Sequence, residues 1–359
     1  MRPALSNPTG VGVYLQNIVK ELSELDEQNS YHLFSSSWKE RYPRTIYGKN
    51  FQIHDLRMPV RMLNYLWSHF SKPSMEWLLK LPLDIVHSPT PLIIPARRAR
   101  KITTVMDLHF YFYPEHTQNE IRKDYARLIQ QHSTRSDAII AISDHTRTQL
   151  IEHLNVPASR VYTIHLGADE FYFQNPSESE MQTVKDRFHL QRPYFLFVGA
   201  QEPRKNLELL IRAFLQLPAD VCLVFAGPRG WGEQAWRQRW NDRMIETGYV
   251  SKLDLRALYR GAVALVQPSL EEGFGLPLLE AMSSGTPVLA SRIPVFSEIC
   301  GDAFLPFDNT SDEELQQAMI AVCSDSSLRN QLIARGKERA KKFSWRETAQ
   351  KTLEIYNHL

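Results

Sequence analysis

Short runs of apolar residues alternate along this chain with segments in which apolar residues recur at the spacing of an amphipathic helix. Such runs, bounded by polar, Gly or Pro residues, are typical of strands in parallel sheets whose two faces are covered by helices. The pattern therefore predicts an α/β protein. Strands are expected at 31–35, 51–56, 84–87, 102–106, 137–142, 161–165, 194–198, 221–226, 262–267, 287–290 and 303–306.

Helical spacing fills most of the intervals between these strands. Helices are expected at 12–25, 119–135, 145–154, 206–215, 252–260, 277–284, 312–323, 327–342 and 345–356. A polar stretch, 175–185, lacks an apolar period and contains Pro176, which favours a connector. With 359 residues, the chain is expected to form two doubly wound, Rossmann-like domains. The predicted boundaries are 1–174, a linker at 175–193, a second domain at 194–343 and a final helix at 344–359.

The segment from Glu272 to Glu280 carries the strongest chemical signal. Its glycines, Gly273 and Gly275, allow the backbone to approach a ligand closely, and Pro277 suits a first helical turn. The amides freed at such a helix start can bind a phosphate, while an ionised carboxylate can accept hydrogen bonds from sugar hydroxyls. On this pattern alone, a structural turn with Glu280 complementing the helix dipole fits equally well.

A second segment favours the functional interpretation. Arg204 and Lys205 lie between the expected strand 194–198 and the helix that follows, where cations oppose the helix dipole. In a parallel sheet this position points into the crevice at the carboxyl ends of the strands. A guanidinium fork beside a point charge is suited to neutralising a diphosphate.

The ordered set of motifs resembles the retaining glycosyltransferases of family 4, which have the GT-B fold. The resemblance covers the whole second half of the chain and, more loosely, the first half. The carrying residues in the second half are Val198-Gly199, Glu202-Pro203-Arg204-Lys205-Asn206, Phe225-Ala226-Gly227-Pro228, Gly248-Tyr249-Val250, Leu258-Tyr259-Arg260-Gly261 and Glu272 through Val288. In the first half they are Thr9-Gly10-Val11-Gly12, Asp84-Ile85-Val86-His87, Thr104-Val105-Met106-Asp107 and Ser143-Asp144-His145-Thr146-Arg147. The Glu202-Pro203-Arg204-Lys205-Asn206 segment is similar to that of mannosyl-transferring members of the family.

The resemblance implies two Rossmann-like domains facing across a cleft, with the last helix crossing back to the first domain. It also implies a nucleotide-sugar donor (GDP- or UDP-linked), a glycan or lipid-linked acceptor, retention at the anomeric carbon, and neither a cofactor nor a metal. Lys205, Arg204 and Glu272 would be catalytic, and Glu280 would hold the ribose. The other expected donor contacts are Gly273, Phe274, Gly275, Leu276, Val250, Gly199 and Gly12. The chain has no Asp-x-Asp pair to hold a metal.

Three departures from the family pattern concern the first half and one loop. The family usually opens with an apolar strand before its Gly-rich loop, but here Met1 is followed within a few residues by Gly10-Val11-Gly12. Either this strand is missing or the start was assigned too late. The usual His-Asp pair is Met106-Asp107, so His109 is the expected substitute, with His87 as a second acceptor-side candidate. Gly10, Val11 and Asp107 are expected on the same acceptor side. Ala200 stands where many members have Arg, which shifts phosphate neutralisation to Arg204 and Lys205.

Composition narrows the partners and the compartment. The net charge of +2 and the absence of a dense basic run do not favour nucleic acid. Three widely separated cysteines without metal spacing, and the lack of a signal peptide or spanning stretch, favour a cytoplasmic protein. Residues 60–81 mix aromatic and basic side chains, so they are either a peripheral contact with the inner face of a membrane or part of the core and its rim.

Three functions remain open at this point. The first is a glycosyltransferase acting in polysaccharide or glycoconjugate biosynthesis. The second is a nucleotide-sugar-modifying or phosphorolytic enzyme on the same architecture. The third is a catalytically impaired protein that binds a nucleotide sugar, which the departures at Met106 and Ala200 allow but the presence of Lys205, Glu272 and Glu280 disfavours.

Overall fold

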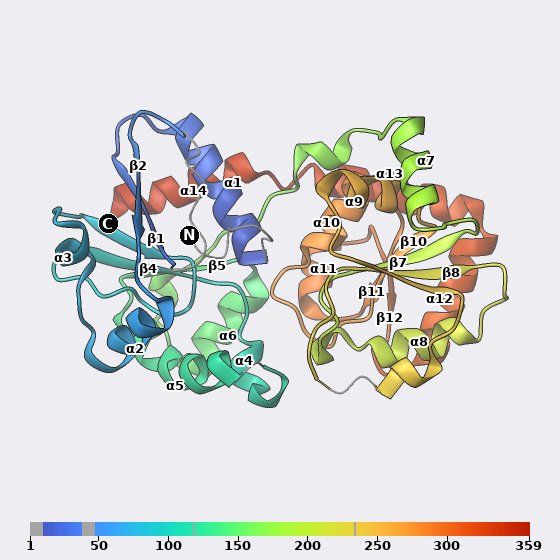
Figure 1. The fold of residues 1–359 in the computed structure, drawn as a ribbon, viewed down its shortest axis with the longest axis horizontal. Helices are drawn as coiled ribbons and strands as arrows, with labels where there is room; N and C mark the ends of the chain where they lie inside the picture. Colours follow the sequence, from blue (N-terminus) through green and yellow to red (C-terminus); the bar gives the residue numbers. More distant parts are fainter. Residues whose placement is uncertain (1–9, 38–46, 118, 233–234) are drawn as a thin grey trace. The chain divides into compact units, whose positions relative to one another are not determined.

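The computed structural model describes residues 10–37, 47–117, 119–232 and 235–359 (Figure 1). The chain divides into two compact units: unit 1 combines the residues up to Gly167 with Ser344–Leu359, and unit 2 spans Ala168–Phe343. The sequence leaves open whether the family's first strand is missing from this chain. That question concerns the residues before Gly10, which lie outside the described part.

Unit 1 contains two parallel sheets. The larger sheet has the order β3-β4-β5-β6, formed by Ile85–Ser88, Arg100–Val105, Ala138–Ala141 and Val161–Thr163. The smaller sheet pairs β1 (Tyr31–Ser36) with β2 (Phe51–Leu56) in parallel. The helices are α1 (Gly10–Leu25), α2 (Val60–Phe70), α3 (Met75–Leu79), α4 (His109–Phe112), α5 (Asn119–Arg135), α6 (Asp144–Leu154) and α14 (Trp345–His358).

The last helix belongs to unit 1 although it follows unit 2 in the sequence. Helix α14 packs along α1, and the rings of Tyr14 and Trp345 lie 6.5 Å apart (Figure 1). Both side chains are buried, so this contact anchors the end of the chain on the first unit. The crossing of the last helix back to the first domain is therefore confirmed.

Unit 2 is built on one six-stranded parallel sheet with the order β12-β11-β10-β7-β8-β9. In chain order its strands are β7 (Tyr194–Val198), β8 (Cys222–Ala226), β9 (Met244–Gly248), β10 (Ala264–Gln267), β11 (Val288–Ser291) and β12 (Leu305–Phe307). Its helices are α7 (Glu178–Arg187), α8 (Leu207–Leu215), α9 (Lys252–Gly261), α10 (Leu276–Ser283), α11 (Pro294–Cys300), α12 (Asp312–Ser324) and α13 (Ser326–Ala340). Short 3-10 turns lie at Pro114–His116, Ala158–Arg160, Glu170–Phe173, Pro203–Lys205 and Ala235–Arg239.

The core of unit 2 explains why its strands could be predicted from apolar runs in the sequence. Every residue of β7, β8, β10 and β11 is buried, because helices cover both faces of the sheet. Helix α8 turns almost its whole length into this core, with Phe214 fully buried. The α/β prediction with two parallel, Rossmann-like sheets is confirmed.

Several elements differ from the sequence-based expectation. The expected connector at 175–193 contains helix α7, which starts at a capping box between Ser177 and Glu180 and buries only Val184. One buried residue in ten is too weak a signal for periodicity to detect. Helix α1 starts at Gly10, two residues before the expected helix start at Gly12, so the expected Gly10-Val11-Gly12 loop is its first turn. Strand β9 was not expected, because its burial is only partial beyond Met244.

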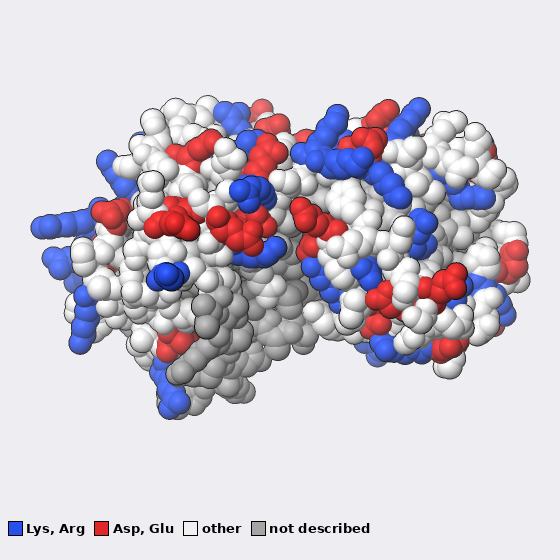
Figure 2. Space-filling view, turned by 90° about the horizontal axis from the view of Figure 1, so that it is seen from above, with Lys and Arg blue, Asp and Glu red and all other residues white. Residues whose placement is uncertain are grey.

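Charged side chains are distributed evenly on the surface that Figure 2 shows. Lys and Arg alternate there with Asp and Glu over both units, so no single sign dominates this face. Within the described residues, no helix has both the length and the apolar character that crossing a bilayer requires.

Candidate functional site

The strand order of unit 2 defines a point at which the direction of winding reverses. From β7 the chain proceeds outward to β8 and β9 on one side, then returns to β10, β11 and β12 on the other. The loops after β7 and β10 therefore leave the sheet in opposite directions, and ligands of such folds bind in the crevice between them. Arg204 and Lys205 follow β7, and Glu272 follows β10.

These three side chains form one ionic cluster. Lys205 Nζ bonds Glu272 Oε1, and Arg204 Nη1 donates to Glu272 Oε2 at 3.0 Å. Ser269 Oγ adds a third hydrogen bond to Oε1 at 2.9 Å. A backbone hydrogen bond from Leu270 N to Arg204 O, 2.8 Å long, ties the two loops together. The structure thus brings together the three residues that the sequence singled out as catalytic.

The cluster is buried and balances its charges internally. Lys205 and Glu272 are 6% and 7% exposed, so their charges have lost most of their hydration. Burial alone would raise the pKa of Glu272, but Lys205 and Arg204 reverse this effect and lower it to about 2. Glu272 is therefore ionised at neutral pH. Glu202 Oε1 also lies 3.4 Å from Arg204 Nη2, so two carboxylates balance the two cations at the end of the sheet. An anionic ligand would compete with Glu272 and Glu202 for these two cations.

Glycines allow the backbones around the cluster to lie close together. Gly199 ends β7 with φ +146° and lies under Lys205, whose Cε would be 3.5 Å from a Cβ at this position. Gly227 ends β8 with φ +143°, and a Cβ there would overlap the carbonyl of Gly199. A larger residue at Gly227 would push the two loops apart, and the positive φ of both glycines disfavours any other residue at either position.

The Gly-rich segment after Glu272 leads into helix α10 as the sequence predicted. Gly273 and Phe274 are buried, and the Phe274 ring packs edge-on against Phe343 at 6.1 Å. Gly275 caps the helix in the left-handed region with φ +102°. Leu276 is then the first helical residue, and no side chain caps this helix start. Pro277 has no N–H and Leu278 N donates to Gly275 O, so contacts with an anion would come from the amides before Pro277.

Glu280 lies one turn further along α10, near two tyrosines. Its Oε2 accepts a hydrogen bond of 2.8 Å from the Tyr259 hydroxyl. Burial raises the pKa of Glu280 to about 7, and repulsion from Asp169 adds to this, while the Tyr259 hydrogen bond and Lys252 oppose it. A carboxylate that titrates near neutrality and keeps an oxygen for a further donor suits a ribose diol.

Val250 occupies the loop between β9 and α9, and its side chain is partly exposed. The Ser251 hydroxyl caps α9 by accepting a hydrogen bond from Asp254 N, which fixes the backbone next to Val250. The loop lies at the carboxyl edge of the sheet, as a nucleobase contact requires. That role for Val250 stays a prediction.

The candidates in unit 1 have different surroundings. His87 Nδ1 bonds the Tyr356 hydroxyl at 2.6 Å and Nε2 bonds Thr104 Oγ1 at 2.7 Å, and burial lowers the pKa of His87 to about 4. Both ring nitrogens are thus used to link β3, β4 and α14. We do not retain His87 as an acceptor contact.

The loop after β4 holds the remaining candidates of unit 1. Asp107 Oδ1 accepts a hydrogen bond from the backbone N of His109 at 3.2 Å. The His109 ring is buried and stacks on Tyr113 and His116, with centroids 5.1 and 5.4 Å away. Gly10, Val11 and Gly12 lie in α1, and Gly12 is buried. Acceptor roles for Asp107, His109, Gly10 and Val11, and the donor role for Gly12, remain predictions.

Two polar residues of the site were missed from the sequence. Ser269 orients Glu272, and Tyr259 orients Glu280. In the sequence analysis, Tyr259 is included only as part of the motif Leu258-Tyr259-Arg260-Gly261, and no role is predicted for it. Its helical spacing is that of a core residue. Ser269 lies two residues after the end of β10, and its position at the strand end was the available signal.

The high pKa of Glu280 makes a prediction about stability. The folded chain holds a proton on Glu280 up to about pH 7, whereas the unfolded chain releases it near 4.5, so this group lowers the free energy of unfolding as the pH rises through that window. Glu280→Gln removes the titration. Relative to wild type, the variant should gain about 2 kcal/mol between pH 5 and pH 8 in urea unfolding.

Glu338→Gln, an exposed glutamate of α13, is the matched control and should show no such gain. A stability difference between wild type and Glu280→Gln that does not change with pH would contradict the assigned environment of Glu280.

Comparison with known families agrees with this arrangement. Residues 8–170 match the family model described as glycosyltransferase family 4, and residues 179–339 match that of glycosyl transferases group 1. O-antigen chain mannosyltransferase B of Escherichia coli is 29% identical over 98% of this chain and 96% of its own length. O-antigen chain mannosyltransferase RfbU of Salmonella typhimurium is 30% identical over 63% of this chain and 61% of its own.

Solved structures show the same fold. A sucrose-phosphate synthase from Thermosynechococcus elongatus superposes with a TM-score of 0.79 at 19% identity, covering 99% of this chain and 96% of that one. Anabaena Alr3699/HepE, solved in complex with UDP-glucose, gives a TM-score of 0.75 at 18% identity over 98% and 97% of the two chains. With both halves matched, the chain belongs to the group 1 glycosyltransferases of the retaining family 4 and has the GT-B fold.

Proposed function

We propose that this protein transfers a hexose, with retention, from a nucleoside-diphosphate donor to a glycan or lipid-linked acceptor. The observation that carries the proposal is the buried Lys205–Glu272–Arg204 cluster at the switch point of unit 2. Breaking the bond between a sugar and a diphosphate concentrates negative charge on the leaving phosphate. Preorganised cations and free amides in a site with little water stabilise that charge most effectively.

Each residue of the cluster has a distinct role in this proposal. Lys205 and Arg204 neutralise the diphosphate, and the uncapped amides at the start of α10 add donors. Glu272 aligns the two cations and, with an oxygen turned to the donor sugar, accepts from its hydroxyls. Glu280 holds the ribose. Since side chains supply the positive charge, we propose that transfer does not depend on a metal ion.

Mannose is the proposed sugar. The E. coli and Salmonella relatives are described as O-antigen chain mannosyltransferases, and the Glu202-Pro203-Arg204-Lys205-Asn206 segment is similar to that of mannosyl-transferring members. We accordingly propose a role in polysaccharide or glycoconjugate synthesis. His109 and Asp107 of unit 1 are the proposed contacts on the acceptor side.

Residues 60–81 are proposed to contact a membrane when the acceptor is lipid-linked. On α2 the apolar residues Met62, Tyr65, Leu66 and Phe70 recur at helical spacing, and Tyr65 and Phe70 are 56% and 60% exposed. Trp77 of α3 is 68% exposed. Lys72 and Lys80, both exposed, could pair with anionic headgroups.

Lys205→Ala should reduce transfer by at least about a hundredfold, which corresponds to losing one charge-stabilising donor. Incorporation of labelled sugar into acceptor measures this. Lys341→Ala, which removes an exposed lysine of the same unit, should retain wild-type transfer. Removing one partner of a buried ion pair costs stability, so the unfolding midpoint is measured alongside. Wild-type transfer by a folded Lys205→Ala protein would refute the proposed site.

A panel of nucleotide sugars tests the donor. GDP-mannose should raise the unfolding temperature more than UDP-glucose, UDP-galactose or free GDP, because a ligand that binds only the folded state stabilises it by mass action. A larger rise in unfolding temperature with UDP-glucose would contradict GDP-mannose as the donor and indicate UDP-glucose instead. Turnover of the donor to a modified nucleotide sugar without any acceptor would instead favour a modifying enzyme.

Vesicle binding tests the membrane contact. The double variant Tyr65→Ser/Trp77→Ser should sediment with vesicles containing anionic lipid at least several-fold less than wild type, because it removes two exposed interfacial aromatics. Ile320→Ser, at an exposed apolar residue of α12, is the control and should sediment like wild type. Equal sedimentation of all three proteins would exclude residues 60–81 as the contact.

A further inference from the structure

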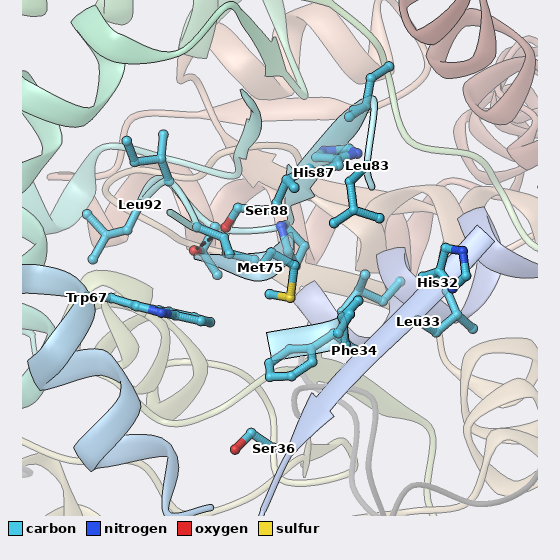
Figure 3. Close-up of a pocket in the computed structure, with 18 of the residues that line it drawn as sticks. His32, Leu33, Phe34, Ser36, Trp67, Met75, Leu83, His87, Ser88 and Leu92 are labelled. Carbon is cyan, nitrogen blue, oxygen red and sulfur yellow. Dashed lines mark hydrogen bonds between the residues drawn. The ribbon is translucent and has the colours of Figure 1, made fainter. Parts of the chain in front are cut away.

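A cavity of about 1530 Å³ in unit 1 is lined mainly by apolar side chains (Figure 3). The polar side chains labelled among them already bond other parts of the protein. Ser36 Oγ donates to Met58 O at 2.8 Å, for example, and Ser88 Oγ bonds Thr90 Oγ1 at 3.0 Å. Polar groups with room for a further partner lie instead in unit 2, near Glu280, the proposed ribose contact.

Asp169 and Lys252 form an accessible ion pair in unit 2. Lys252 Nζ bonds Asp169 Oδ2, and the lysine and aspartate side chains are 51% and 25% exposed. Asp169 Oδ1 accepts a hydrogen bond of 2.9 Å from Phe171 N, and Lys252 Nζ lies 4.9 Å from the centre of the Phe171 ring. Lys252 is the first residue of α9, two positions after Val250. The pair is thus held in place beside the loop that the sequence predicts to meet the nucleobase.

Tyr172 connects this ion pair to the ribose contact. Burial raises the pKa of the Tyr172 hydroxyl, and the charges of Glu280 and Asp169 raise it further, as does Tyr249. Because such electrostatic effects weaken with distance, these three groups are neighbours of Tyr172. The Tyr172 ring also packs edge-on against Tyr259, which bonds Glu280, with ring centroids 5.8 Å apart. Glu280, Asp169 and Tyr249 therefore border one region of unit 2.

The ion pair presents a donor next to two acceptors. A carboxylate has about four lone-pair positions, two on each oxygen. Lys252 uses one position on Oδ2 of Asp169, and Phe171 N uses one on Oδ1. Each oxygen thus keeps a position for a further N–H group. The Lys252 ammonium, which has several N–H donors, also keeps a donor for a ligand.

The Watson–Crick edge of guanine is complementary to this arrangement. It carries the acceptor O6 followed by the donors N1–H and N2–H. Lys252 would donate to O6, while the two oxygens of Asp169 accept from N1–H and N2–H. Uracil has only N3–H at this edge, and its O2 would face a carboxylate oxygen and be repelled. Adenine places an unprotonated nitrogen where guanine has N1–H, so the carboxylate would repel it too.

We propose that the Asp169–Lys252 pair selects guanine as the base of the nucleotide donor, with the ring of Tyr249 stacking on that base. The inference rests on the proposed transfer from a nucleoside-diphosphate donor and specifies its nucleotide. Tyr249 is 56% exposed and directly precedes Val250. Stacking on an aromatic ring adds affinity for every base, so the selection among bases falls to the ion pair.

Calorimetric titration with GDP, IDP and UDP tests the pair. IDP differs from GDP only in lacking the N2 amino group. Wild type should bind GDP at least about tenfold more tightly than IDP, because a hydrogen bond to a charged group is lost. UDP should also bind more weakly than GDP. Equal affinities for GDP and IDP would overturn the proposal.

Asp169→Asn should bring the affinities for GDP and IDP to within about threefold of each other, because the amide offers one acceptor fewer than the carboxylate. UDP should bind this variant at least as tightly as it binds wild type, which shows that the fold is retained. Asp312→Asn, in a comparable exposed ion pair with Arg212, is the matched control and should keep the wild-type ratio.

Tyr249→Ala should weaken all three nucleotides by a similar factor and leave the ratio of GDP to IDP affinity unchanged. A uniform loss of affinity in Asp169→Asn would mean that the pair only supports the fold, and would overturn the proposal. Tighter binding of UDP than of GDP by wild type would overturn the selection of guanine while leaving sugar transfer in place. Binding of none of the three nucleotides would contradict the proposed function itself.

Discussion

The charge cluster at the end of the unit 2 sheet is the interaction on which the rest of the site depends. Lys205, Arg204 and Glu272 come from loops that follow two neighbouring strands, and their ion pairs join these loops. Burying such charges costs several kcal/mol each, which only good geometry and further hydrogen bonds offset. A hydrophobic trio would stabilise the fold more simply. A buried cluster in which two cations lie side by side is best explained by an anionic ligand that binds them.

The surrounding backbone conformation also positions the groups of this site. Gly199 and Gly227 adopt positive φ values and let neighbouring loops pack without side chains between them. Gly275 caps the start of α10 in a left-handed conformation, and no side chain caps this helix start. Glu280 is kept partly out of water, and its carboxyl is therefore easily protonated near neutral pH. The cations Arg204 and Lys205, the start of α10 and the Glu280 carboxylate thus all lie at the carboxyl edge of one sheet.

The sequence predicted unit 2 better than unit 1 for a physical reason. Strands such as β7 and β8, buried on both faces, leave unbroken apolar runs, and the residues after them could be placed at the sheet edge. Lys205, Glu272 and Glu280 were found in this way. Helix α7 buries only Val184, and β9 is half-exposed, so neither leaves a periodic signal. His87 shows a different limit. Its position at a strand end was predicted, but its hydrogen bond to Tyr356, which lies 269 residues further along the chain in α14, was not.

The most direct measurement of the central claim is a crystal structure with a bound nucleoside-diphosphate sugar. The account predicts diphosphate oxygens within about 2.7–2.9 Å of Lys205 Nζ or the Arg204 guanidinium, the usual length of a charge-assisted hydrogen bond. It also predicts the ribose hydroxyls on Glu280. A diphosphate bound elsewhere, with Lys205 still paired with Glu272 and out of contact with phosphate, would contradict it.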